Sequence, residues 1–326
     1  TYASDKIRGF KQTHQPSPWI NDYGQFSIMP MVGKPEFDEE KRASWFGHKG
    51  EEATPYYYKV YLAEYDIVTE MSPTERAVLF RFTFPENAHS YIAVDAFDKG
   101  SFIQIIPEEN KIIGYSTKNS GGVPENFKNY FVIYFDKPFT FVSAVSENNI
   151  LPNETEVKGN HTGAIIGFAT KKGEIVHARV ASSFISPEQA ELNLKELGNH
   201  TFDQLVSNGK AVWNREMSKI EIEDDNIDNL RTFYSCLYHA FPTQFLRDRC
   251  KRASDALQSL QWQSASRLYV HRHRILGHIP LLVSFSQSNV SVNEPENAGG
   301  IGECLQRKRL PAGMGKSGTS WLHGRQ

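Results

Sequence analysis

The sequence contains little cysteine. Three of its 326 residues are cysteines, Cys236, Cys250 and Cys304. They lie far apart and form no CxxC pair, so neither a disulfide framework nor a zinc site is indicated. A chain of this length can bury a substantial core without such crosslinks.

Long apolar runs and an excess of one charge are also absent. The longest apolar run, Ile279 to Phe285, is far shorter than the roughly 18 residues that a membrane span needs. The 36 Lys and Arg nearly balance the 38 Asp and Glu, which leaves a net charge of −2. No field of one sign favours nucleic acid. We therefore expect no membrane span and no nucleic-acid partner.

Apolar and aromatic residues are present in the amounts typical of globular proteins, at 39% and 12%. Short β-branched and aromatic runs, bounded by Pro, Gly and Asn, recur from Tyr23 to about Phe184 and predict strands. Clear examples are Tyr56–Leu62, Ala77–Phe84, Tyr91–Val94, Tyr130–Phe135 and Ala164–Ala169. No helical pattern of about 10 to 15 residues separates them, which argues against a parallel α/β sheet. Residues 1–185 are predicted to form a large antiparallel β-sandwich.

The periodicity becomes helical after Ser186 and Pro187. Apolar residues precede Gly198, a residue that ends helices, and a second helical pattern continues from Phe202. Residues 228–240 form a third pattern with an apolar stripe that needs a helical neighbour. The region 186–245 is therefore predicted to be a helical linker that would lead into a further helical domain.

The composition changes again near residue 246. Residues 246–326 hold 12 Lys and Arg against 5 Asp and Glu, so this tail carries +7 and residues 1–245 carry −9. Four of the 40 aromatic residues fall in the tail, which makes it poor in the groups that dominate core burial. We expect the tail to be poorly ordered. Its His271, His273 and His278 lie among arginines without an orienting carboxylate, so no metal site is assigned there.

A polar cluster, Thr13–Gly24, precedes the first good strand and has the composition of an ordered surface loop that carries a site. Its Trp19 offers an apolar face, and His14, Gln15 and Asp22 offer hydrogen-bonding groups. Such a set suits a sugar ring, which has an apolar face and a ring of hydroxyls. A rigid structural loop with a buried Trp fits the composition equally well.

Several distinct motifs occur in order along residues 1–245, namely Ile7–Phe10, Thr13–Trp19, Asp22–Pro30, Ser120–Pro124, Phe184–Leu194 and Trp213–Asn214. Together they resemble glycoside hydrolase family 92. The resemblance implies an exported, calcium-dependent, exo-acting α-mannosidase that inverts the anomeric centre. It also implies that the sandwich packs against a C-terminal (α/α)6 barrel, with the active site between the two.

The resemblance places the catalytic acid, the catalytic base and the calcium ligands in the barrel, which is missing here. No catalytic or metal-binding residue is therefore assigned to this chain. Calcium is expected in the parent enzyme and not in this fragment. His14, Gln15, Trp19 and Asp22 are the expected contacts to mannose-containing glycans, and the missing barrel is the expected protein partner.

Both ends of the chain are expected to be artificial. The sequence opens at Thr1 without an initiator Met, so we expect a truncated N-terminus from which a targeting segment has been removed. A shift of the reading frame would explain the change at residue 246. Codons can be chosen for residues 260–262, 270–280 and 316–322 that, when read from their second base, encode family-like segments such as Thr-Gly-Phe-Trp-Asp-Thr. We expect one extra base near the codons for Phe245 and Leu246.

The sequence thus predicts a fragment of an inverting α-mannosidase that is itself inactive. The alternative is a β-sandwich module that binds carbohydrate without catalysis, and a domain that merely buttresses a barrel is a third reading.

Overall fold

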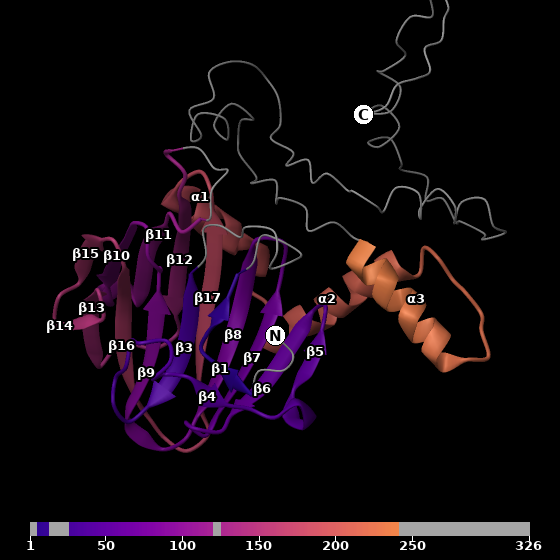
Figure 1. Cartoon of the computed structure of the whole chain (residues 1–326), viewed down its shortest axis with the longest axis horizontal. Helices are drawn as coiled ribbons and strands as arrows, with labels where there is room; N and C mark the ends of the chain where they lie inside the picture. Colours follow the sequence, from indigo (N-terminus) through magenta and orange to yellow (C-terminus); the bar gives the residue numbers. More distant parts are fainter. Residues whose placement is uncertain (1–4, 13–25, 120–124, 241–326) are drawn as a thin grey trace, which may run out of the picture.

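The computed structural model describes residues 5–12, 26–119 and 125–240, and two antiparallel sheets pack face to face in it (Figure 1). One sheet has nine strands, in the order β15 (Glu156–Gly159), β10 (Ser101–Ile106), β11 (Lys111–Ser116), β12 (Asn129–Phe135), β17 (Glu174–Ser183), β8 (Ala77–Phe84), β7 (Ile67–Pro73), β6 (Tyr57–Leu62) and β5 (Glu52–Thr54). The other has six, in the order β14 (Asn149–Pro152), β13 (Phe141–Ser146), β16 (Thr162–Thr170), β9 (Asn87–Asp95), β3 (Ser27–Val32) and β2 (Phe10–Lys11). A small ribbon of β1 (Lys6–Ile7) and β4 (Ser44–Trp45) completes the strands of the described residues. The predicted sandwich is confirmed.

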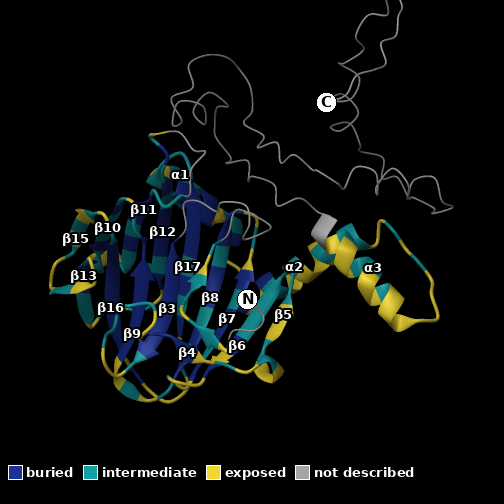
Figure 2. Ribbon diagram, in the orientation of Figure 1, coloured by how far each residue is buried: buried dark blue, intermediate teal, exposed yellow. Residues whose placement is uncertain are grey.

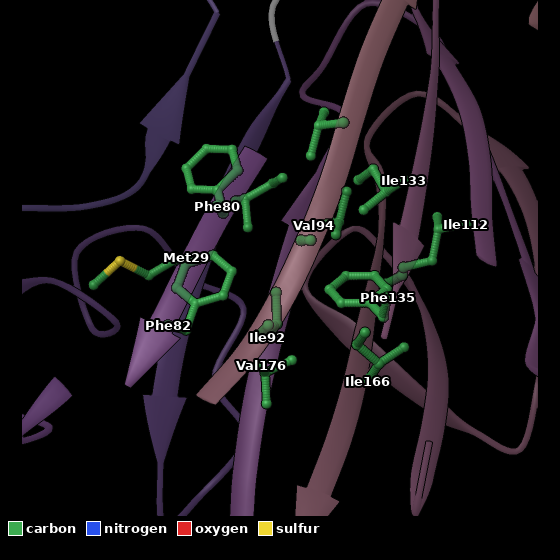
Figure 3. Close-up of a cluster of buried hydrophobic side chains, with 14 of the residues drawn as sticks. Met29, Phe80, Phe82, Ile92, Val94, Ile112, Ile133, Phe135, Ile166 and Val176 are labelled. Atoms are coloured by element: carbon green, nitrogen blue, oxygen red, sulfur yellow. The ribbon is translucent and has the colours of Figure 1, made fainter. Parts of the chain in front are cut away.

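The main core lies between the two sheets (Figure 3). Alternation along β8 points Phe80, Phe82 and Phe84 inward, where they meet residues of the six-stranded sheet such as Ile92 and Ile166. All five of these side chains are at most 4% exposed. Hydrophobic burial of this extent is the main stabilising contribution to the sandwich.

The first part of the helical linker packs on the outer face of the nine-stranded sheet. It consists of α1 (Pro187–Asn193), the short 3-10 helix η3 (Leu194–Leu197), α2 (Phe202–Met217) and α3 (Ile227–Ala240). Leu197 and Phe202 pack with Leu79 of β8 in a second buried cluster. Both faces of β8 are therefore buried, which explains why its sequence is almost continuously apolar.

Local signals in the sequence set the ends of these helices. The Ser186 hydroxyl accepts a hydrogen bond from the Gln189 backbone N–H, and Thr201 and Gln204 form a reciprocal capping box. Gly198 ends η3 with φ of 51°, a left-handed value that glycine adopts without strain. The predicted helical linker and its stop residue are confirmed.

Helix α3 extends away from the sandwich (Figure 1). None of its residues 227–238 is buried, and Ile227 remains 57% exposed (Figure 2). The rings of Trp213 on α2 and Tyr238 on α3 lie 5.3 Å apart. Of the expected apolar stripe, Leu230, Phe233, Tyr234 and Leu237 are only half-buried, and Tyr238 is 39% exposed.

Phe37, in the loop before Arg42, packs closely against Gly163 on β16, and this contact gives a stability prediction. A methyl group at Gly163 would collide with the Phe37 ring and lie 2.6 Å from the Val94 carbonyl oxygen. Gly163→Ala should therefore lower the free energy of unfolding by about 1–3 kcal/mol, as overpacking does. Urea unfolding of the full chain measures it. Gly47→Ala is the matched control, because a methyl group there meets nothing within 4 Å. Equal stabilities of the two variants would contradict the packing.

Candidate functional site

Buried polar side chains gather where strands of both sheets end. We call this the polar end of the sandwich, and it comprises Ser27, Asp95, Ser101, Ser116, Thr162, Ser182 and Ser183. The strand register brings Ser27 opposite Asp95 and Ser101 opposite Ser116. The Thr162 backbone N–H donates to the Ser101 hydroxyl at 2.9 Å, which links the two sheets there. Buried polar groups need such partners, so their positions are fixed.

The two residues that flank segment 13–25, Gln12 and Phe26, lie at the polar end. Just before it, the Gln12 side-chain oxygen accepts a hydrogen bond of 2.6 Å from the Ser182 hydroxyl on β17. Just after it, the Phe26 ring stacks on the Phe131 ring of β12, with 4.4 Å between the centroids. Gln12 and Phe26 adjoin β2 and β3 of the six-stranded sheet, but both of these contacts are to strands of the nine-stranded sheet.

A second segment and the helical linker begin at the same end. Residues 120–124 lie between the last residue of β11, Ser116, and the first residue of β12, Asn129, which are direct register partners. Helix α1 follows β17 there, and the Asn193 side chain donates to the Ser182 carbonyl oxygen at 2.9 Å. The polar end therefore holds the residues that flank both segments and the start of the path from β17 to α1 (Figure 1).

A buried ion pair fixes the electrostatics of this end. Arg42 donates to the Asp95 carboxylate at 2.9 Å, and their side chains are 0% and 1% exposed. His161 lies 2.8 Å from the other carboxylate oxygen. Burial alone would raise the pKa of Asp95, but the His161 hydrogen bond and the Arg42 charge outweigh it and hold that pKa below its usual value. Asp95 therefore remains charged inside the protein.

The four predicted sugar contacts, His14, Gln15, Trp19 and Asp22, all fall outside the described residues. The structure describes the residues that anchor their segment instead. Of these, Gln12 and Phe26 were not singled out from the sequence, where Gln12 directly precedes the polar cluster and Phe26 follows it by two residues.

The described residues hold no group of three or more His, Cys, Asp or Glu side chains that could bind a metal ion. Nor does any helix among them combine the length and the apolar character that crossing a membrane would take.

Comparison with known proteins identifies the family. The model of the glycosyl hydrolase family 92 N-terminal domain matches residues 1–183, which is more than half of the chain. The chain belongs to glycosyl hydrolase family 92. The model of the family's catalytic domain matches residues 189–256.

Solved structures of family 92 members share this fold. The chain is 41% identical to an inverting mannosidase of the family from Bacteroides thetaiotaomicron, with a TM-score of 0.72 over 75% of this chain and 34% of that one. It is 29% identical to a family 92 α-mannosidase from the same organism in complex with mannoimidazole, with a TM-score of 0.61 over 68% and 33% of the two chains.

A curated relative from Arthroderma benhamiae, named as a secreted glycosidase, is 24% identical over 274 residues, which cover 74% of this chain and 36% of the relative. The chain thus spans about a third of the length of the relatives that it matches.

The His161–Asp95 contact gives a pH prediction. The hydrogen bond to Asp95 raises the pKa of His161 above its usual 6.5, against the opposing effect of burial, and the Glu147 and Asp98 charges add to the rise. Protonated His161 therefore stabilises the fold below about pH 6.5, and this contribution falls as the pH rises through the folded pKa. His161→Gln should cost about 1–2 kcal/mol at pH 5.5 and much less at pH 8.5.

Urea unfolding of the full-length variant and of the unchanged protein at both pH values measures this difference. An equal loss at the two pH values would mean that His161 contributes packing and not charge.

Proposed function

We propose that the chain is the N-terminal part of an exo-acting, inverting α-mannosidase that hydrolyses α-mannosidic linkages in glycans. Its membership of family 92, with 41% identity to an inverting mannosidase, carries this proposal. In this proposal the polar end is the sugar-facing end of the sandwich, because segments 13–25 and 120–124 and the path to the helices all start there.

The chemistry requires two carboxyl groups about 6.5–9.5 Å apart, one to protonate the leaving oxygen and one to activate water. Two well-positioned carboxylates, Asp95 at the polar end and Glu191 on α1, do not suit either role. Asp95 is buried in its ion pair. Glu191 accepts hydrogen bonds from Lys111 at 2.5 Å and from Tyr134 at 2.7 Å. These bonds outweigh burial and hold the pKa of Glu191 below its usual value, whereas a general acid needs a raised one.

In this proposal the acid and the base belong to the helical barrel of the whole protein, as the resemblance to the family implies. The described residues do not fit calcium either, since they hold no suitable group of ligands. No step attributed to this chain runs through the ion. In this proposal the parent enzyme depends on calcium bound by the barrel, and this fragment binds none.

The contribution of this chain is to bind sugar. His14, Gln15, Trp19 and Asp22 would contact mannose, with the indole against the apolar face of the ring and the other side chains at its hydroxyls. The anchors at Gln12 and Phe26 support this role because they fix both ends of the segment. Export is part of the proposal, in line with the relative named as a secreted glycosidase.

The alternative function is a carbohydrate-binding sandwich without catalysis. The observation that favours it is that both anchors of segment 13–25 lie within the sandwich, so the segment does not depend on a barrel for its attachment.

Our domain proposal has the sandwich at 1–185, the helical linker at 186–245 and a frame-shifted tail at 246–326. The tail lies outside the described residues. The two family models meet between residues 183 and 189.

The chain should not hydrolyse α-mannosides, because in this proposal the acid and the base belong to the barrel of the whole protein. Release of 4-nitrophenol from 4-nitrophenyl α-mannoside by the full chain, with and without added calcium, measures this. Turnover that a chelator abolishes would show that the chain contains a complete active site.

Trp19→Ala should abolish binding of mannose-containing glycans to the full chain if Trp19 stacks on the sugar. Isothermal titration with a mannotriose measures the affinity. Trp45→Ala is the matched control, because Trp45 is an exposed tryptophan, at 47%, and lies away from the polar end. Its carbonyl oxygen accepts a hydrogen bond from the Ala63 backbone N–H, in the turn that joins β6 to β7 at the opposite end of the sandwich. Equal loss in both variants would contradict the assignment.

The proposed frame shift predicts one extra base in the DNA near codons 245 and 246. Sequencing across codons 240–255 tests it. An uninterrupted frame would show that the tail is the natural continuation of the chain.

A further inference from the structure

A hollow of about 400 Å³ lies at the corner of the nine-stranded sheet where β10, β11 and β15 reach the polar end. Residues that line it include Lys99, Tyr115, Thr117, Glu125, Lys128 and Lys158. Its volume is within the range of small-molecule sites. The corner lies on the side of the sandwich away from α3 (Figure 1).

One wall of the hollow is a strained loop. Phe97, Lys99 and Gly100 have φ of 59°, 76° and 109°. A bulky side chain such as that of Phe97 rarely adopts a positive φ, so surrounding groups must hold it. The Phe97 backbone N–H donates to buried Asp95 at 2.9 Å, and its carbonyl oxygen accepts from the Ser101 hydroxyl at 2.9 Å.

The same loop places Lys99 at the hollow. Its backbone N–H donates to the Asn160 side chain at 3.2 Å, and the Thr117 hydroxyl lies 2.5 Å from its carbonyl oxygen. Its ammonium group donates to the Asn119 carbonyl oxygen at 2.5 Å. A positive φ at residues other than glycine persists only where surrounding contacts hold the backbone in place, and such residues are common at functional sites.

The hollow carries an excess of positive charge. Lys99, Lys128 and Lys158 face a single lining carboxylate, Glu125. Among the described residues, no carboxylate lies within ion-pair distance of Lys128 or Lys158, whereas neighbouring Lys118 is paired with Asp98. Cations that share a concave site without carboxylate partners attract an anion.

Aromatic rings extend from the hollow across the outer face of the sheet. Phe102, Tyr115 and Tyr130 are direct register partners on β10, β11 and β12, with ring centroids 5.7 and 5.9 Å apart. The Lys128 ammonium lies 4.4 Å from the centre of the Tyr115 ring. The site therefore combines apolar ring surface with cationic groups.

We propose that this hollow binds an anionic sugar residue through its carboxylate or phosphate group. The anion lies between the ammonium groups of Lys128 and Lys158, and the sugar ring packs against the wall formed by Tyr115. This site adds a second, charge-selective glycan contact to the chain, and it does not depend on segment 13–25.

Titration of the full chain tests the proposal with four probes: D-glucuronate, D-glucose 6-phosphate, D-glucose and inorganic phosphate. One or both charged sugars should bind at least tenfold more tightly than glucose and than inorganic phosphate, and which of them binds distinguishes carboxylate from phosphate. The double variant Lys128→Gln, Lys158→Gln should lose at least tenfold in affinity. Lys172→Gln, at the exposed turn between β16 and β17, is the matched control and should change nothing.

Thermal unfolding confirms that the variants are folded before they are titrated. Glucose that binds as tightly as the charged sugars would overturn the proposal. So would inorganic phosphate that binds as tightly as glucose 6-phosphate, which would leave an anion site without a sugar. Absence of binding by every probe at millimolar concentration, or an unchanged double variant, would overturn it too.

Discussion

A buried charge at the end of β9 organises much of this molecule. Asp95 is 1% exposed and accepts hydrogen bonds from Arg42, His161 and the Phe97 backbone. Arg42 is itself fully buried and also donates to the carbonyl oxygens of Arg8 and Phe37. Loss of one partner of such a pair typically costs about 3–5 kcal/mol, because the other charge is left uncompensated. The loop that covers β9 and the N-terminal strand therefore both depend on this carboxylate.

The Asp95 carboxylate also supports the residues next to both proposed sugar sites, which are segment 13–25 and the basic hollow. It holds Phe97 in its left-handed conformation, and the Lys11 ammonium lies 4.8 Å from the centre of the Phe97 ring. Lys11 and Gln12 lead into segment 13–25, which carries the proposed mannose contacts. Phe97 also begins the loop that forms a wall of the basic hollow. In the proposed function the sandwich supports the sugar-binding segments at its polar end, and the acid–base chemistry is assigned to another part of the protein.

Local patterns in the sequence were sufficient to predict the elements of the fold. The run Ala77–Phe84 is a strand over the same residues, and the apolar stripe from 228 to 240 is helix α3. The order of the strands was not predictable, because neighbours such as β12 and β17 are joined by long connections. The Arg42–Asp95 pair was missed for the same reason, since 53 residues separate its members. The hollow was not predictable either, because Lys128 and Lys158 line it together only once β10 and β11 have paired between β15 and β12. Neither lysine is marked by its neighbours in the sequence.

Whether the polar end faces the sugar can be measured by NMR titration of the isotope-labelled full chain with methyl α-mannoside. If it does, the backbone amide shifts of Lys11, Gln12 and Phe26, with those of Ser182 and Ser183, change together as the sugar is added. Residues at the opposite end, such as Gly33 and Gly173, should not respond. Shifts confined to that opposite end, or no shifts at all at saturating sugar, would contradict the account.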